Sequence, residues 1–275
     1  MPKIALNGAS IDYQLCGNGL ETVVFAHGLL LNRRIFSDQL ATLSGRYRCL
    51  AFDFRGHGQS SVPRTGYDLE QLEADTAGLI EAMKAVPCHF VGLSLGGIIG
   101  LRLAIRRPEL LRSLVVLSAT PDAEAPANKK QYRLLVLVAL MFGLRVVVDR
   151  LMPVMFGRSF LSDPKRVELQ RQWRQNLAAN RRLGAARAVA AFLKREAVYD
   201  QLGSITTPTL IGVGEEDTAA AKGEARRILS RIEGSRLVEI PRAGHVVTIE
   251  GPGAVNGLLA DFLRDFSLRA APQAG

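Results

Sequence analysis

Short apolar runs alternate with longer segments of helical periodicity along most of the chain. Most of the apolar runs end at glycine, proline or asparagine, as strands commonly do, and the periodic segments have the 3.6-residue repeat of helices. The predicted strands are 3–6, 10–16, 22–26, 47–52, 86–91, 114–117, 207–214 and 236–240. The predicted helices are 33–43, 68–85 with Asp68 as N-cap, 98–105, 219–231 and 253–266. This alternation predicts an α/β fold, a mostly parallel sheet with helices on both faces.

The alternation is interrupted in the middle of the chain. Residues 121–202 show no strand pattern, and their apolar positions predict four helices at 129–142, 144–156, 164–179 and 183–194. The strand pattern returns at 207–214. We therefore expect a core domain of residues 1–120 and 203–270, with residues 121–202 inserted as a helical cap, or lid.

The basic residues are concentrated in the same segment. The 275 residues carry a net charge of +9, and residues 121–202 contribute 15 basic and 7 acidic side chains, a net of +8. A solvated basic face is the ordinary interpretation of such a segment. Charges that face a pocket entrance would instead attract anionic substrates. The chain has no basic and aromatic motif of a known nucleic-acid-binding module, so no nucleic-acid partner is expected.

No targeting or membrane-spanning segment is expected. The start, Met1 to Ile4, leads directly into a strand and lacks the pattern of a secretory signal. The most apolar stretch, Leu134 to Val148, is interrupted by Arg145 and is shorter than the ~18 residues of a membrane span. We predict no stable membrane insertion, and contact with a membrane surface is the weaker alternative, because the basic and apolar residues do not separate into two faces.

The cysteines indicate the compartment. They are odd in number and each lies in a strand-like run: Cys16, Cys49 and Cys88. Buried free thiols are the expected state, and this predicts a cytoplasmic location.

One stretch links a predicted strand to a predicted helix by a very tight turn. It reads Gly92-Leu93-Ser94-Leu95-Gly96, a Gly-x-Ser-x-Gly pattern. Glycine is needed where backbone segments approach too closely for a Cβ atom. The central serine would then occupy a strained position with its hydroxyl directed away from the sheet. The motif alone occurs by chance in many chains, but its strand–turn–helix context predicts a nucleophilic serine.

A serine hydroxyl needs a base within hydrogen-bond reach, and the chain has four histidines. His27 and His57 lie in glycine-rich loops, and His89 lies inside the strand that leads to Ser94. His245 follows the last predicted strand, so it lies at the same carboxyl edge of the sheet as the serine. We predict His245 as the base.

The base in turn needs a carboxylate that fixes its tautomer. Asp217 follows the preceding strand and is the predicted partner, with Glu216 as the alternative. The order Ser94, Asp217, His245 is that of the α/β-hydrolase arrangement. A developing oxyanion needs two donors, for which we predict the backbone N–H groups of Leu29 and Leu95.

The chain resembles the α/β-hydrolase family from about Ile4 to Phe266. The matching pieces are His27-Gly28, Asp53 to Ser60, Gly92 to Gly97, Pro208 through Asp217, and Gly244-His245. Among its members it is similar to small bacterial carboxylesterases and 3-oxoadipate enol-lactonases. The resemblance implies an eight-stranded sheet with one antiparallel strand and a helical cap after strand six. It also implies that the loop of Asp53 braces its neighbours rather than taking part in chemistry.

The resemblance and the candidate residues together predict an enzyme that hydrolyses a small-molecule carboxylic ester or lactone through an acyl-enzyme. Two alternatives stay open: hydrolysis of a carbon–carbon bond in a keto-dienoic acid, and a non-catalytic hydrolase-like binding protein. No cofactor and no metal are expected, and the chain is expected to be a monomer or homodimer. Part of the apolar cap run should line the pocket. The residues predicted to contact substrate are Leu30, Leu93, Leu135, Val138, Met141 and Val246, together with Leu137.

Overall fold

The eight expected strands form one sheet in the computed structural model, which describes residues 2–220 and 222–268. Their order in the sheet is β1-β2-β4-β3-β5-β6-β7-β8. The strands are β1 (Lys3–Leu6), β2 (Ala9–Cys16), β3 (Thr22–Ala26), β4 (Arg48–Phe52), β5 (Cys88–Leu93), β6 (Leu111–Leu117), β7 (Thr209–Gly214) and β8 (Arg236–Ile240). Strand β2 runs antiparallel to both of its neighbours, and the pairs from β4 to β8 are parallel. The prediction of a mostly parallel sheet is confirmed.

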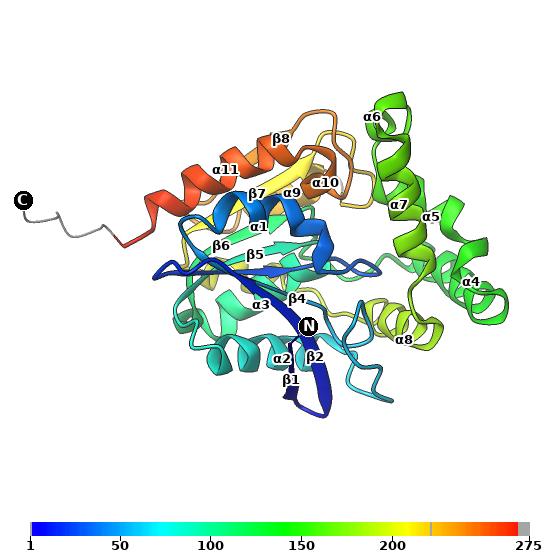
Figure 1. The fold of residues 1–275 in the computed structure, drawn as a ribbon, viewed down its shortest axis with the longest axis horizontal. Helices are drawn as coiled ribbons and strands as arrows, with labels where there is room; N and C mark the ends of the chain where they lie inside the picture. Colours follow the sequence, from blue (N-terminus) through cyan, green and yellow to red (C-terminus); the bar gives the residue numbers. More distant parts are fainter. Residues whose placement is uncertain (1, 221, 269–275) are drawn as a thin grey trace, which may run out of the picture.

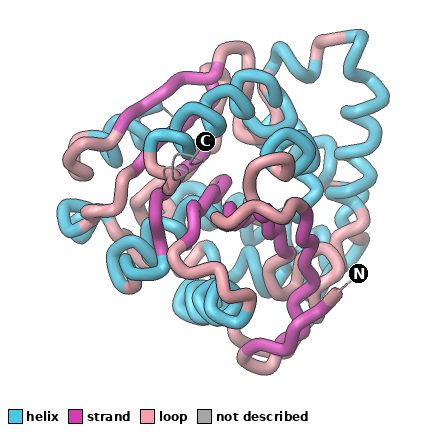
Figure 2. The backbone as a smooth tube through the Cα atoms, turned by 60° about the vertical axis from the view of Figure 1, so that its left-hand side comes forward, coloured by secondary structure: helices cyan, strands magenta, loops and turns pink. Residues whose placement is uncertain are grey.

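Helices cover both faces of this sheet (Figures 1 and 2). Helices α1 (Ser37–Leu43) and α11 (Pro252–Asp265) pack in the apolar core of one face. Helices α2 (Leu69–Ala82), α3 (Leu95–Arg106) and α9 (Lys222–Leu229) pack in the core of the other. The central strands β3 and β5 are buried along their whole length because both of their faces are covered.

Five helices lie between β6 and β7 and gather at one end of the sheet, on the right of Figure 1. They are α4 (Pro126–Phe142), α5 (Val148–Met155), α6 (Arg158–Leu161), α7 (Val167–Ala178) and α8 (Arg182–Phe192). Their buried aromatic residues Phe156, Phe160 and Trp173 belong to the same apolar core as α1 and α11. We call this segment the inserted helices. No helix of the described residues is long and apolar enough to cross a membrane.

Several element boundaries differ from the prediction for local reasons. Short 3₁₀ segments precede α1, α5 and α7, so three predicted helices begin with a tighter turn: Arg33–Phe36, Leu144–Val146 and Pro164–Arg166. Further 3₁₀ segments span Pro108–Leu110 and Tyr199–Ser204. Helices α6 and α10 (Val247–Glu250) have four residues each, too few to give a periodic pattern. The predicted cap of α2 is confirmed, because the Asp68 carboxylate accepts the Gln71 backbone N–H at 2.9 Å.

Candidate active site

The turn between β5 and α3 depends on two close backbone contacts. A Cβ atom on Gly92 would lie 2.2 Å from the carbonyl oxygen of Gly96. A Cβ atom on Gly96 would lie 2.0 Å from the carbonyl oxygen of Ala26. A side chain at either position would push the helix away from the strands, so only glycine allows this turn.

Ser94 is the single residue between the end of β5 and the start of α3. Its backbone has φ 54° and ψ −112°, a conformation that residues with a side chain rarely adopt. Its N–H donates to the carbonyl oxygen of Leu117 at 2.8 Å, which helps to hold the turn. Strain of this kind costs about 1–3 kcal/mol and is concentrated at functional sites. The side chain is partly exposed and lines a cavity.

His245 and Asp217 meet at the same cavity. The His245 Nδ1 atom lies 3.0 Å from Asp217 Oδ2 and 3.2 Å from Oδ1. Asp217 Oδ1 also accepts the backbone N–H groups of Ala219 and Ala220, each at 2.9 Å. An ionised carboxylate only accepts hydrogen bonds, so Nδ1 donates its proton to Asp217 in this contact, and Nε2 is the ring nitrogen left for another partner.

The Asp217 carboxylate is held in its ionised form. Burial would raise the pKa of this carboxyl, but the charge of His245 and the hydrogen bonds from His245 and Ala220 outweigh it. The pKa of Asp217 therefore lies below its ordinary value. A carboxylate that stays charged can stabilise a positive charge on His245.

The neighbouring Glu216 has a different partner. Its Oε1 accepts the Ser159 hydroxyl at 2.6 Å, and its Oε2 accepts the Ser159 backbone N–H at 2.8 Å. These bonds lower the pKa of Glu216 and join the loop after β7 to α6. Of the two carboxylates considered from the sequence, Asp217 contacts His245 and Glu216 contacts the inserted helices.

The two predicted backbone donors are the N–H groups of Leu29, in the loop after β3, and of Leu95, the residue that follows Ser94. Leu95 is the first residue of α3, so its N–H has no acceptor within the helix. Leu29 lines the cavity, and it follows Gly28, at which a Cβ atom would lie 3.2 Å from the Ser94 Cβ. Neither N–H donates a hydrogen bond to an acceptor in the described part of the chain.

Glu250 is a site residue that the sequence analysis missed. Its Oε2 accepts the backbone N–H groups of Gly157 at 2.7 Å and Gly244 at 2.9 Å, and its Oε1 accepts that of Val246 at 3.1 Å. The Glu250 carboxylate thereby binds the backbone of both neighbours of His245 and that of Gly157, which lies between α5 and α6. Burial raises the pKa of Glu250 to about 7, although these N–H donors favour the ionised form. The sequence gives no signal of this role, because the four-residue helix α10 is too short for a periodic pattern.

The other three histidines are buried away from the cavity. His27 Nε2 accepts the Phe54 backbone N–H at 3.0 Å, and burial lowers the pKa of His27. Burial likewise lowers the pKa of His57 to about 3 and that of His89 to about 4. All three are therefore neutral at pH 7, in structural positions.

The Asp53 loop braces its surroundings, as the resemblance implies. The Asp53 carboxylate accepts the backbone N–H groups of Arg33 and Gln59, each at 2.8 Å, and pairs with the Arg33 guanidinium. Arg55 forms two hydrogen bonds with Asp75, at 2.6 and 2.7 Å. These groups are buried and satisfied by one another, so none is available to a substrate.

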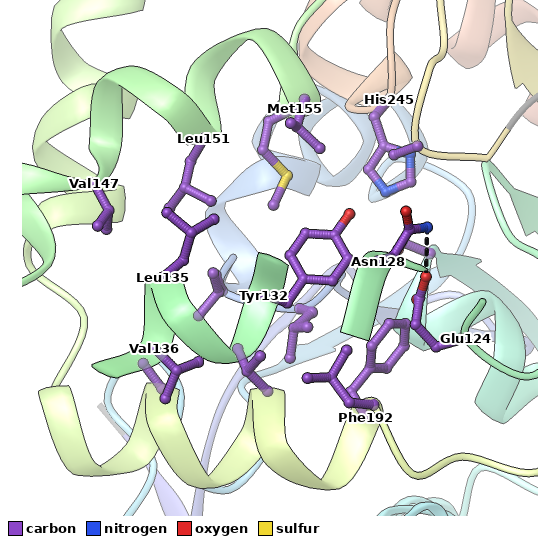
Figure 3. Close-up of a pocket in the computed structure, with 18 of the residues that line it drawn as sticks. Glu124, Asn128, Tyr132, Leu135, Val136, Val147, Leu151, Met155, Phe192 and His245 are labelled. Atoms are coloured by element: carbon purple, nitrogen blue, oxygen red, sulfur yellow. Dashed lines mark hydrogen bonds between the residues drawn. The ribbon is translucent and has the colours of Figure 1, made fainter. Parts of the chain in front are cut away.

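The cavity has a volume of about 330 Å³ and lies between the sheet edge and the inserted helices. It is lined by Ser94 and His245 from the sheet edge and by residues of α4, α5 and α8. Figure 3 shows the polar residues Glu124, Asn128 and Tyr132 on the His245 side. The apolar Leu135, Val147 and Leu151 lie at the other end. The cavity thus joins a polar end near the candidate chemistry to an apolar end.

The structure places the predicted substrate contacts in four groups. Leu30 and Leu135 line the cavity, as does Leu29. Leu93 and Val246 lie instead in the apolar core with no exposed surface. Val138 is half-buried and packs against that core. Met141 and Leu137 are 63% and 55% exposed, because they lie on the outer face of α4. Only the first group therefore reaches the cavity.

The charged groups at the cavity are mostly basic. Arg150, Arg182 and Arg195 line it, together with Glu124. Arg195 pairs with Glu124 at 2.9 Å and is stacked on the Phe192 ring, so its charge is already balanced. Within the described residues, no cluster of His, Cys, Asp and Glu is arranged to hold a metal ion.

This arrangement matches a family of known enzymes. The model of the alpha/beta hydrolase family matches residues 23–258. The chain belongs to the alpha/beta hydrolase family. It is therefore a hydrolase, with the mostly parallel eight-stranded sheet of that family.

Relatives and solved structures cover most of the chain. The “Putative carbamate hydrolase RutD” of Pantoea ananatis is 30% identical over 89% of this chain and 88% of its own. The 3-oxoadipate enol-lactonase 2 of Acinetobacter baylyi is 27% identical over 89% of each chain. The crystal structure of the enol-lactonase from Burkholderia xenovorans LB400 has a TM-score of 0.89 and 26% identity, and covers 96% of this chain and 100% of that one.

Proposed function

We propose that this alpha/beta hydrolase is a serine hydrolase that cleaves a carboxylic ester or lactone. The observation that carries the proposal is the 3.0 Å contact between His245 and Asp217, at a cavity that the strained Ser94 also lines. A neutral imidazole oriented by a carboxylate is what a serine hydroxyl needs to become a nucleophile.

The proposed reaction has two stages. Ser94 Oγ attacks the carbonyl carbon of the substrate while His245 Nε2 takes the hydroxyl proton. The backbone N–H groups of Leu29 and Leu95 stabilise the negative charge on the carbonyl oxygen. The leaving alcohol then takes the proton from His245, which leaves an acyl group on Ser94. His245 next activates a water molecule, which releases the acid and restores the serine.

We further propose that the inserted helices act as a cap over this site, with residues 1–120 and 203–270 as the core domain and 121–202 as the cap. Residues of α4, α5 and α8 line the cavity opposite Ser94, which supports this division. The apolar end formed by Leu135, Val147 and Leu151 would receive an apolar part of the substrate.

The test is direct detection of the covalent intermediate. The protein is mixed with 4-nitrophenyl esters of increasing acyl length, quenched early and examined by mass spectrometry. We expect one acyl group on the peptide that contains Ser94, and turnover of esters or lactones. A carbamate and a keto-dienoic acid serve as comparison substrates. Faster turnover of either would reassign the substrate class, and no turnover of any would favour a binding protein.

A further inference from the structure

Helix α4 presents apolar residues on two opposite faces. Its inner face lines the cavity through Tyr132, Leu135, Val136 and Ala139, which follow the helical repeat. Its outer face carries large apolar side chains at a second set of helical positions. These are Leu134, Leu137, Met141 and Phe142, with Val146 in the turn that follows, and they are 55–66% exposed. We call these five residues the outer apolar strip.

An exposed strip of this kind is unusual. A helix that is apolar on both faces is normally buried on both, and a contiguous exposed apolar patch usually marks an interaction site. The inner face borders the cavity, which explains its apolar side chains. The outer face has no such partner among residues 2–220 and 222–268, since its side chains remain more than half exposed.

Basic residues surround the strip. Lys130 lies four residues before Leu134, Arg133 lies four residues before Leu137, and both are exposed on the same side of α4. Arg145 is exposed between Phe142 and Val146. The chain has no Asp or Glu between Glu124 and Asp149.

A fourth cation, Arg182, which also lines the cavity, borders the end of the helix. A Cβ atom on Gly143, which directly follows α4, would lie 2.9 Å from the Arg182 guanidinium. Within the described residues, Lys130, Arg133, Arg145 and Arg182 form no ion pair. The strip is thus an apolar surface bordered by cations that form no ion pair with a carboxylate of the described residues.

We propose that the outer apolar strip docks on an anionic lipid surface. The sequence pattern disfavours such contact because the basic and apolar residues do not separate into two faces, but in the structure the basic residues border an exposed apolar face. The apolar side chains enter the boundary between headgroups and acyl chains, and the surrounding cations contact the lipid phosphates. Because the inner face of the same helix lines the cavity, docking brings the cavity next to the layer in which apolar esters accumulate. This surface contact does not require a membrane-spanning helix, and it is independent of the chemistry at Ser94.

A second copy of the chain fits this surface less well. A two-fold dimer would place the strip against itself. Lys130, Arg133 and Arg145 of both copies would then meet in one interface, with no carboxylate from the segment between residues 124 and 149 to neutralise them. An anionic lipid surface supplies the opposite charge.

The experiment is co-sedimentation of the full chain with vesicles. Phosphatidylcholine vesicles are compared with vesicles of equal parts phosphatidylcholine and phosphatidylglycerol, at low and high salt. The apolar variant carries Leu134→Gln and Phe142→Gln, and the charge variant carries Lys130→Gln and Arg133→Gln. Leu20→Gln is the control for the apolar variant, because Leu20 is fully exposed in the loop before β3. Lys3→Gln with Lys84→Gln removes the same charge outside the inserted helices.

We expect binding to the anionic vesicles that weakens at high salt and is weak on phosphatidylcholine alone. Each α4 variant should bind about tenfold or more weakly, whereas the two controls should bind like the parent. Equal melting temperatures check that the exposed substitutions leave the fold intact, and the charge variant tests the proposal even if the apolar variant does not fold. No binding to anionic vesicles, or binding that both α4 variants retain, overturns the proposal. A concentration-dependent dimer that the α4 variants abolish would replace it with self-association.

Discussion

Two regions border the cavity, and they are held by different interactions. At the sheet edge, backbone contacts and hydrogen bonds fix Ser94 and His245. Gly92 and Gly96 allow close backbone contact at the Ser94 turn, and the Ser94 N–H donates to Leu117. The N–H groups of the two neighbours of His245 donate to Glu250. Across the cavity, the inserted helices are held by apolar side chains such as Phe156 and Trp173. The reacting groups therefore depend on local backbone geometry, whereas the shape of the cavity depends on side-chain packing.

One junction between the two regions is at Glu250. The Gly157 N–H after α5 and the Gly244 N–H before His245 both donate to Glu250. A Cβ atom on Gly244 would lie 2.2 Å from the Gly157 nitrogen, so the two segments are in direct backbone contact. Substitutions at the sheet edge should thus affect the rate of reaction, those in the inserted helices the choice of substrate, and those at the junction both activity and stability.

The largest effect is expected from Ser94→Ala. Removing the proposed nucleophile should lower kcat/KM for the best ester by about a thousandfold or more, with little change in the free energy of unfolding. Steady-state kinetics and thermal denaturation measure the two quantities. Ser204→Ala, at an exposed serine that does not line the cavity, is the control and should retain the activity of the parent. Similar losses for both serines would contradict the assignment.

The adjacent carboxylates at the sheet edge give the second comparison. Asp217→Asn should lower kcat by at least a hundredfold, because it removes the charge that orients His245 and stabilises its protonated form. Glu216→Gln should change kcat little, because Glu216 contacts Ser159 rather than the imidazole. The reverse order of effects in a kcat measurement would show that Glu216 is the orienting acid.

The junction is tested by Glu250→Gln. An amide cannot accept all three N–H groups that Glu250 accepts, so the loop around His245 should lose its support. We expect unfolding to be easier by about 1–3 kcal/mol and kcat to fall by roughly tenfold. Denaturant unfolding and ester kinetics measure these changes. A fully stable and active variant would show that the junction is not needed to position His245.

The stability that Glu250 gives to the parent protein should depend on pH. The pKa of Glu250 is raised to about 7 in the folded protein, so the unfolded chain releases this proton first as the pH rises. The contribution of Glu250 to stability therefore decreases as the pH rises through the window from the ordinary carboxyl pKa to 7. Glu250→Gln does not titrate, so its difference in melting temperature from the parent should narrow across this window. A constant difference would exclude an elevated pKa.

The smallest effect is expected from the inserted helices. Leu135→Phe adds bulk to the apolar end of the cavity and should shift the preference toward shorter acyl chains by about threefold to tenfold. Met141→Phe, on the outer face of the same helix, should leave the preference unchanged. The kcat/KM values of both variants for a series of 4-nitrophenyl esters measure this acyl-chain preference. A change of acyl-chain preference in Met141→Phe would show that Met141 contacts the substrate, as the sequence predicts.

The sequence correctly predicts those features that depend on local patterns along the chain. The strands and the Asp68 cap follow from short patterns, and the sheet edge follows from the rule that loops after parallel strands meet there. Glu250 was missed because its role depends on a contact with Gly157, 93 residues away in the chain. Met141 was assigned to the cavity because the apolar run of α4 does not show which of its two faces points inward.

The sequence by itself determined the sheet, the tight turn at Ser94, and the order of the three candidate catalytic residues. Each depends on local patterns: apolar runs, glycines where no Cβ fits, and polar residues directly after strands. Tertiary structure decided which carboxylate contacts His245, which face of α4 lines the cavity, and that Glu250 ties the inserted helices to the sheet edge. These depend on contacts between segments far apart in the chain, and a hydrophobic pattern records only that a side chain is apolar, not what it packs against.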